Sequence, residues 1–509
     1  MVSSSSPTRP RATTRDWLAL GVLTLAVVLL AVDGTVLALA VPALSADLAP
    51  SATQILWIGD IYSFALAGLL VTMGNVADRI GRKRLLLIGS VGFGLSSVLA
   101  AFSSTPEMLI VARAVLGISG ATLMPSTLSI VRSIFLDPAQ RTRAIAIWSA
   151  GATGGAAAGP LIGGALLEHF WWGSVFLINV PVVVVILIAG SFLLPESRNP
   201  ERAPIDILSA LLSIATIVPL VYAIKHAVGS GPDVLAGVAA AIGAIAGLLF
   251  VRRQRRLTTP LIDLALFRMP AFSGAVVANT LSVFAFSGLL FFFSQYLQLV
   301  RGFSPLLAGV AELPVTIASI AVIAVIGLIL RRLGAGRAIG GGLAIAAAGF
   351  VVLTVAEGIT GYAALAVALA LIGLGIGVSM TLSTDAIVAA APRERAGAAA
   401  SISETGYELG VALGIAVLGS LQLVVYRTTL ALPTGLPDST AAALEESLAK
   451  GASLIEQGDT LGTEGLEAAR EAFTIGMQIA SVGAALVLAV AAVIAWRVIP
   501  SLREPNRGR

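Results

Sequence analysis

The sequence predicts an all-α integral membrane protein with 14 transmembrane helices. Hydrophobic residues occupy 57% of the 509 positions, only 12% carry a charge, and the mean hydropathy is +0.95. A soluble domain has about 25% charged residues and exposes few large apolar patches. These values exclude a soluble fold. The absence of cysteine also excludes disulfides and thiolate chemistry.

Each predicted helix is a run of about 20 mostly apolar residues, the length that crosses a bilayer. The first eight runs are 17–40, 53–73, 85–103, 107–130, 142–166, 172–194, 205–225 and 233–251. The last six are 272–299, 304–330, 337–355, 361–384, 398–426 and 473–497. The first run is too long for the apolar part of a signal peptide, and no small-residue cleavage site follows it closely. We therefore expect it to be retained.

Basic residues predict the orientation of the helices, because cytoplasmic loops are enriched in Lys and Arg. With the N-terminus placed in the cytoplasm, 26 of the 32 basic residues fall in cytoplasmic segments, and Arg113 lies within a predicted helix. The residues that fall on the outer side are Lys225, Arg301, Arg427, Lys450 and Arg470. The pattern predicts a multi-pass protein of the cell inner (plasma) membrane with both termini in the cytoplasm. Its arginine clusters are expected to contact anionic membrane lipids, and they indicate no nucleic-acid binding.

Two loop patterns recur at nearly the same offset along the chain. Arg141 and Arg143 open the fifth run as Arg393 and Arg395 open the thirteenth, and the loop GNVADRIGRKR is similar to the later GLILRRLGAGR. The recurrence predicts a duplicated six-helix unit, a design that places a transport site between two halves of the protein.

The predicted organisation has five parts and one long external segment. The parts are a cytoplasmic tail (1–16), an N-terminal six-helix bundle (17–194), two inserted helices (205–251), a C-terminal six-helix bundle (272–497) and a second tail (498–509). The external segment, 427–471, is Ala-rich and predicts a helical hairpin around its glycines. A hairpin that gates the outer vestibule and a passive acidic loop are equally compatible with this composition.

Five stretches resemble motifs of the major facilitator superfamily, and in particular of its fourteen-helix drug:proton antiporters. Residues 74–84 resemble the signature loop, with Val76 where leucine is usual. The others are an intramembrane Arg-to-Gly motif (113–117), a glycine-rich antiporter motif (151–164), a first-helix motif around Asp33 and a second-helix motif from Trp57 to Tyr62.

This resemblance implies a major facilitator fold and a proton-coupled exporter of lipophilic cationic and amphiphilic drugs. Ethidium and other dyes, quaternary ammonium compounds and fluoroquinolones are the implied substrates. It implies a monomer that is not an enzyme and needs no cofactor or metal beyond the proton-motive force. It also implies that the signature loop forms a charged latch that stabilises the outward-facing state. A kinked and tightly packed fifth helix is implied to prevent leakage through the protein. The residues concerned are Gly74, Asp78, Arg79, Gly81 and Arg82 in the loop, and Gly155, Gly159 and Pro160 in the helix.

Six charged residues lie deep in the predicted helices, where an ionisable group is costly and is a functional candidate by default. They are Asp33, Asp60, Arg113, Glu312, Glu404 and Glu408. Burial favours the neutral form of a carboxyl group, so such groups can exchange protons. We expect proton coupling at Asp33, Arg113, Glu312 and Glu404. Arg113 is included because the resemblance implies that the arginine at this position assists proton transfer.

Cationic substrates are expected at the other two carboxylates and at aromatic rings, which attract cations through their faces. The predicted substrate-binding residues are Asp60, Glu408, Trp57, Tyr62, Trp148, Phe292 and Tyr407. For the carboxylates other than Asp33 a structural salt bridge is the alternative, and for the rings it is simple packing.

Other functions stay open at this point. A facilitator for an endogenous metabolite or lipid would use the same fold without needing several buried carboxylates. A lipid flippase and a non-transporting membrane scaffold are further alternatives. A nucleotide-driven pump is disfavoured, because the sequence contains no G-x-x-x-x-G-K-[ST] loop.

Overall fold

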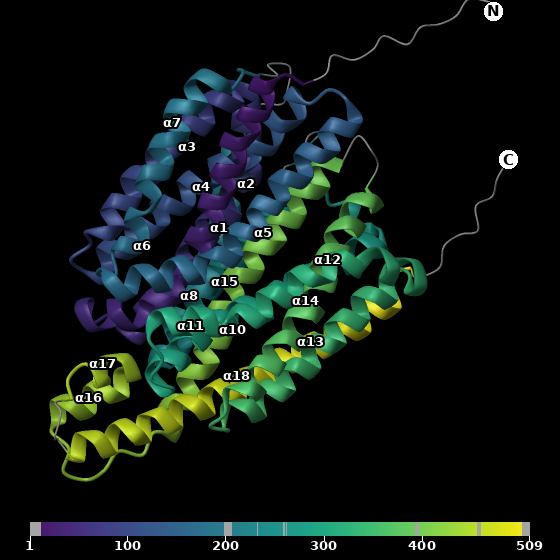
Figure 1. The fold of residues 1–509 in the computed structure, drawn as a ribbon. Helices are drawn as coiled ribbons and strands as arrows, with labels where there is room; N and C mark the ends of the chain where they lie inside the picture. Colours follow the sequence, from purple (N-terminus) through teal and green to yellow (C-terminus); the bar gives the residue numbers. More distant parts are fainter. Residues whose placement is uncertain are drawn as a thin grey trace, which may run out of the picture.

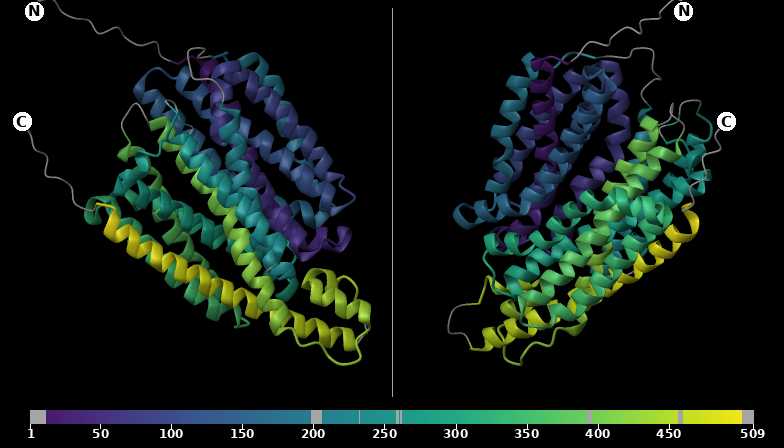
Figure 2. Two further views of the ribbon diagram at one scale, coloured as in Figure 1. Left: turned by 180° about the vertical axis from the view of Figure 1, so that it is seen from behind. Right: turned by 45° about the vertical axis from the view of Figure 1, so that its right-hand side comes forward.

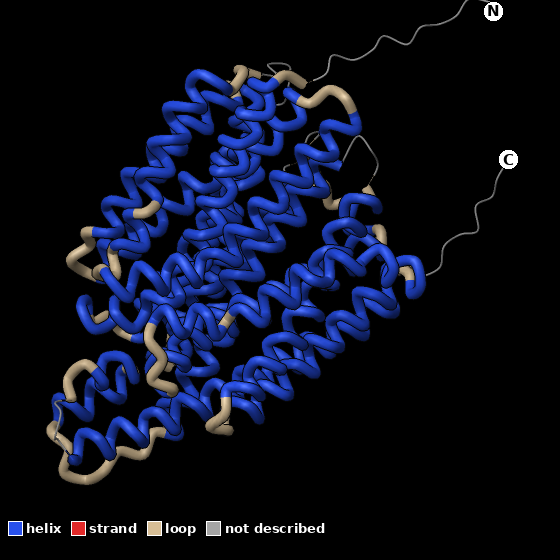
Figure 3. Tube along the Cα trace, in the orientation of Figure 1, coloured by secondary structure: helices blue, strands red, loops and turns tan. Residues whose placement is uncertain are grey.

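A computed structural model describes residues 12–197, 206–231, 233–257, 260, 262–391, 396–455 and 460–500. Within these residues all regular structure is helical, as Figure 3 shows. Fourteen segments are long and apolar enough to cross a membrane. The predicted fold class, with its 14 transmembrane helices, is therefore confirmed. Most of the two predicted tails and Arg393 and Arg395 lie outside the described residues.

The N-terminal helices form one bundle. They are α1 (Thr14–Leu48), α2 (Ala52–Ile80), α3 (Arg82–Ala101), α4 (Pro106–Ile134), α5 (Pro138–His169), α6 (Ser174–Leu177) and α7 (Asn179–Leu193). The sixth crossing is divided between α6 and α7. Side chains that accept from free backbone N–H groups cap the starts of four of these helices; they belong to Thr13, Ser51, Thr105 and Asp137. In the bundle, α1 packs on α5, and α4 packs on α2 and α3.

The inserted helices α8 (Ile207–Ser230) and α9 (Val234–Gln254) pack on each other, and α8 also packs on α2 of the N-terminal bundle. Polar contacts join the start of α8 to the end of α9. Arg253 is ion-paired with Asp206 at 2.9 Å, and the Gln254 amide donates to the Ser209 hydroxyl at 2.7 Å. Burial opposes ionisation of Asp206, but hydrogen bonds from Arg253 and Ser209 outweigh it and lower the pKa of this carboxyl group.

The remaining helices form the second bundle. They are the short η1 (Leu266–Arg268), α10 (Pro270–Gln295) with the π-helical turn η2 (Tyr296–Val300), α11 (Pro305–Ala311), α12 (Leu313–Leu333), α13 (Ala335–Glu357), α14 (Tyr362–Ala390), α15 (Ala396–Thr429), α16 (Asp438–Glu446), α17 (Leu448–Ala452) and α18 (Thr460–Val498). The predicted run 304–330 is interrupted at Glu312, between α11 and α12, where Pro314 occupies the first turn of α12. A proline is tolerated there because first-turn N–H groups have no partner within the helix.

The two bundles lie side by side and diverge toward the end of the molecule from which both chain termini emerge (Figures 1 and 2). We call that end the terminal side, and the opposite end, which carries α16 and α17, the hairpin side. The bundles meet where α2 packs on α15 and α5 packs on α11. A Cβ atom on Gly309 of α11 would lie 2.4 Å from the carbonyl oxygen of Pro160 in α5. Glycine is thus required for this close approach.

The predicted external segment 427–471 contains two short helices, α16 and α17, and ends inside a long one. Helix α18 begins at Thr460, well before the predicted run 473–497. Its first turns project beyond the bundle and carry α16 and α17 (Figure 1). The Glu446 carboxylate accepts from the backbone N–H of Ala52, at 3.1 Å, at the start of α2. The segment therefore links the C-terminal bundle to the N-terminal one.

Candidate functional site

Asp33 lies inside the N-terminal bundle, and both of its carboxylate oxygens are engaged. Arg113 of α4 pairs with Oδ2 at 3.0 Å, and Asn179 of α7 donates to Oδ1 at 2.8 Å. Both charged side chains are buried from solvent. The Arg113 Nε also donates to the carbonyl of Ile58 at 3.2 Å. Helices α1, α2, α4 and α7 are thus joined through one buried ion pair.

The guanidinium of Arg113 lies 4.7 Å from the centre of the Tyr62 ring, within cation–π range. Tyr62, a predicted substrate-binding residue, therefore faces an internal cation. No motif of the sequence points to Asn179. The one available signal is an amide within the apolar stretch FLINVPVVVV.

Asp60 of α2 forms a second buried ion pair, whose cation was not expected from the sequence. The Lys225 ammonium lies 2.8 Å from Oδ1 and 2.7 Å from Oδ2 of Asp60. It also lies 4.0 Å from the centre of the Trp57 ring. The sequence places Lys225 at the outer end of the run 205–225, whereas α8 continues to Ser230 and buries this side chain within the protein. The two predicted substrate-binding residues Asp60 and Trp57 are brought together, with Lys225 between them.

Two further predicted carboxylates, Glu404 and Glu408, lie on α15, one turn apart. Glu408 is buried and lies beside the Ser63 hydroxyl of α2, so it lies at the junction of the two bundles. Glu404 and Tyr407 are half-buried. Trp148 is also half-buried, and its indole N–H donates to Thr127 within the N-terminal bundle at 3.2 Å.

The C-terminal bundle holds two more buried carboxyl groups. Glu312 lies beside the Ser294 hydroxyl, but neither of its oxygens has a hydrogen bond of normal geometry among the described residues. Glu357 accepts from the Ser481 hydroxyl at 3.3 Å. The sequence places Glu357 just past the run 337–355, whereas α13 extends to include it. A span boundary that is wrong by two residues is enough to hide a buried acid.

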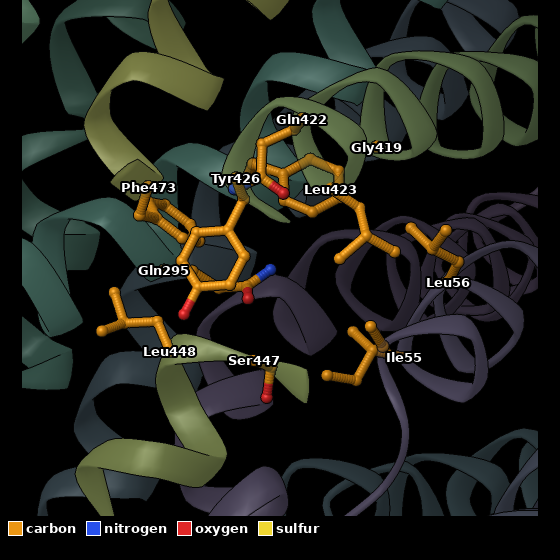
Figure 4. A pocket seen from close by; sticks show the side chains of 12 residues that line it. Ile55, Leu56, Gln295, Gly419, Gln422, Leu423, Tyr426, Ser447, Leu448 and Phe473 are labelled. Carbon is orange, nitrogen blue, oxygen red and sulfur yellow. The ribbon is translucent and has the colours of Figure 1, made fainter. Parts of the chain in front are cut away.

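A small pocket lies between the bundles on the hairpin side (Figure 4). Its walls come from α2, α10, α15, α17 and α18, and Figure 4 shows Leu56, Tyr426, Leu448 and Phe473 around it. Phe292 is the one predicted substrate-binding residue among its described lining residues, none of which is charged. The pocket is therefore uncharged and largely apolar, with Gln295, Gln422 and Ser447 among its polar lining residues, and neither buried ion pair contributes to its walls.

The signature loop makes its described contacts within the N-terminal bundle. Arg82 pairs with Asp78 at 2.8 Å and donates to the Ser197 hydroxyl and the Ser129 carbonyl. Gly81 has a φ of +114°, a conformation that disfavours other residues. In the same loop, Arg79 is exposed. A Cβ atom on Gly74 would lie 3.7 Å from Pro125, an ordinary van der Waals contact, so the packing there does not require glycine.

The glycines of α5 let this helix approach α1 closely. A Cβ atom on Gly155 would lie 2.9 Å from the Val28 carbonyl, and one on Gly159 would lie 1.9 Å from the Thr35 hydroxyl. Small residues at this spacing are typical of tightly packed membrane helices. The glycine-rich stretch therefore has a packing role. Gly159 lies directly before Pro160, which is inside α5.

We expect Gly155→Ala to destabilise the protein by about 1–3 kcal/mol, because the backbone of α1 cannot move aside cheaply. The measurement is thermal unfolding of the purified protein in detergent. The neighbouring Gly154→Ala is the matched control, since a Cβ atom there meets nothing within 4 Å. Equal midpoints for the two variants would contradict a packing role for Gly155.

Two packed helical bundles with 14 potential membrane spans and buried ion pairs inside the protein are typical of a polytopic membrane transporter. The chain belongs to the major facilitator superfamily, whose sequence profile matches residues 23–415. It is 45% identical to the multidrug efflux pump LfrA of Mycolicibacterium smegmatis, over 96% of this chain and 97% of that protein.

Two other relatives are also named for resistance or export. The chain is 38% identical to the methyl viologen resistance protein SmvA of Salmonella typhimurium, over 95% of this chain and 98% of that one. It is 35% identical to the tetracenomycin C resistance and export protein of Streptomyces glaucescens, over 80% and 76%. These relatives place the chain in the drug-efflux part of the superfamily, as a transporter and not an enzyme.

A solved structure supports the fold. The bacterial homolog of the human lysosomal transporter Spinster, in an inward-facing and unoccupied conformation, aligns with a TM-score of 0.65 at 17% identity. The alignment covers 95% of this chain and 98% of that one. At this identity the likeness shows the major facilitator fold alone.

Proposed function

We propose that the protein is a proton-coupled antiporter of the cell membrane that exports lipophilic organic cations. The observation that carries this proposal is the buried Asp33–Arg113 pair, a titratable acid held against a permanent cation inside the bundle. Protonation of Asp33 would remove its attraction for Arg113 and release the contacts among four helices. Proton binding would in this way be linked to a change of helix packing.

The substrate class rests on charge and on the relatives. Besides Asp33, carboxyl groups lie within the helical bundles at Asp60 in α2, at Glu312 after α11, and at Glu404 and Glu408 in α15. An organic cation is the ligand that they would attract. Methyl viologen, after which SmvA is named, is an organic dication. Ethidium and quaternary ammonium compounds have the same chemistry, and we extend the proposal to them and to amphiphilic drugs such as fluoroquinolones.

The conformational cycle is alternating access by a monomer, with the terminal side in the cytoplasm. In the described state the bundles are packed together on the hairpin side and diverge toward the terminal side (Figure 2). Substrate would enter from the cytoplasm, and the bundles would then open on the hairpin side. Arg82 with Asp78 is positioned at the terminal side, where a latch for the opposite state would act.

The test is ethidium efflux from cells that express the protein, with and without a protonophore. We expect efflux to stop when the protonophore collapses the gradient, which is worth about 2.3 kcal/mol per charge per 100 mV. The control is the same strain without the protein. Efflux that continues at full rate after collapse would contradict proton coupling, and a failure to move any organic cation would contradict the substrate class.

A further inference from the structure

The surroundings of Asp60 have the composition of an organic-cation site. A carboxylate supplies the charge, and the face of an indole ring supplies the cation–π contact, which is strongest with tryptophan and in a desolvated place. Asp60 is 0% exposed and Lys225 is 1% exposed. The ammonium contacts both carboxylate oxygens and the Trp57 ring at once. A cation of the chain itself therefore fills the site.

This internal cation comes from neither of the two bundles. Lys225 belongs to α8, which packs between α2 and α15. One turn before it, Val221 packs with Phe64 of α2 and Ala416 of α15 in a small apolar cluster. The same face of α8 thus reaches the junction of the bundles and carries the lysine into it.

Exchange of one cation for another at Asp60 would keep the carboxylate paired throughout. An uncompensated buried charge is strongly unfavourable, so exchange is easier than opening the pair alone. Lys225 precedes the end of α8 by five residues, about 8 Å at the rise of an α-helix. The membrane-spanning part of α8 ends at Ala227, only two residues or about 3 Å beyond Lys225, and an extended lysine side chain can cover that distance to bring its ammonium toward the surface.

We propose that Lys225 is a tethered cation that competes with the transported cation for Asp60 and Trp57, so that α8 controls access to this carboxylate. The inference rests on the proposed export of organic cations, and it adds a regulatory role for the inserted helices.

The first test measures equilibrium binding of tetraphenylphosphonium, a lipophilic cation without a titratable group, to the purified full-length protein. We expect Lys225→Met to bind it at least about tenfold more tightly, a gain within the range of a desolvated cation–π contact. Lys225→Arg keeps a cation in place and should bind like the wild type. The double variant Lys225→Met with Asp60→Asn should lose the gain. An unchanged affinity in Lys225→Met, or a gain that persists without Asp60, would overturn the proposal.

The second test uses the unmodified protein, in case Lys225→Met does not fold. The chain has only three lysines, Lys83, Lys225 and Lys450, so acetylation of each is readily followed by mass spectrometry. We expect acetylation of Lys225 to rise at least about fivefold when tetraphenylphosphonium binds, because the displaced amine becomes reachable. Lys83 and Lys450 serve as internal controls. Binding without a rise at Lys225 would overturn the proposal.

Failure of this inference can be told apart from failure of the proposed function. Both binding tests are made without a proton gradient, whereas the function is judged by gradient-driven efflux. Protonophore-sensitive efflux together with an unreactive Lys225 would leave the antiporter intact and remove only the tethered-cation role. A wild type that exports no organic cation would instead remove the function.

Discussion

Asp33→Asn is expected to reduce proton-driven ethidium efflux to the level of membranes that lack the protein. Asparagine keeps the size and one acceptor oxygen of the side chain but cannot bind and release a proton. It also leaves the Arg113 guanidinium buried without its counter-ion. Loss of one partner of a buried ion pair costs about 3–5 kcal/mol. The measurement is ethidium accumulation in inverted vesicles, which is the equivalent of efflux from cells, under an imposed proton gradient and normalised to the amount of folded protein.

A double variant separates coupling from folding. Asp33→Asn combined with Arg113→Gln removes both charges, so we expect it to recover much of the thermal stability that the single variant loses. Efflux should remain absent, because the protonatable group is still missing. Asp47→Asn is the matched control: Asp47 lies on the same helix, is exposed, and accepts from the Trp172 indole at 2.6 Å, a role that an amide oxygen can fill. Recovery of efflux together with stability would make the pair purely structural.

The membrane crossings could be predicted from the sequence because bilayer thickness fixes the length of an apolar run. The interruption at Glu312 could not, because hydropathy does not distinguish one straight helix from two that meet at a break. The helical hairpin of the external segment was predicted, but not that its second arm, from Thr460, continues without a break into the last membrane crossing. The first turns of α18 lie beyond the apolar run, and α16 and α17 pack against α18.

The buried acids could also be predicted, since a charge in an apolar run is conspicuous. Their partners could not. Lys225 and Glu357 lie at the ends of predicted runs, where a few residues decide between solvent and protein interior. Asn179 is uncharged and belongs to no motif. The pairing of Asp60 with Lys225 joins residues 165 positions apart, and only the packing of α8 on α2 brings them together.

Covalent closure of the hairpin side is expected to arrest efflux completely. Leu56 and Gly419 both line the pocket of Figure 4. Leu56 belongs to α2 of the N-terminal bundle, and Gly419 belongs to α15 of the C-terminal bundle. A Cβ atom on Gly419 would lie 2.6 Å from a methyl carbon of Leu56, so cysteine side chains at these two positions would lie next to each other. The chain has no native cysteine, so the only disulfide that can form within a Leu56→Cys, Gly419→Cys variant is the intended one.

Alternating access requires these two helices to separate on the hairpin side when substrate is released. Oxidation of the double-cysteine variant should therefore stop efflux, and reduction should restore it, with cross-linking followed by electrophoretic mobility. Gly92→Cys with Ser119→Cys is the matched control. These positions lie in α3 and α4 of one bundle, and their Cβ atoms would be 3.6 Å apart, close to the usual spacing in a disulfide. A disulfide there leaves the two bundles free to move relative to each other, so efflux should continue. Undiminished efflux from fully cross-linked Leu56→Cys, Gly419→Cys protein would mean that substrate leaves by a route other than the hairpin side.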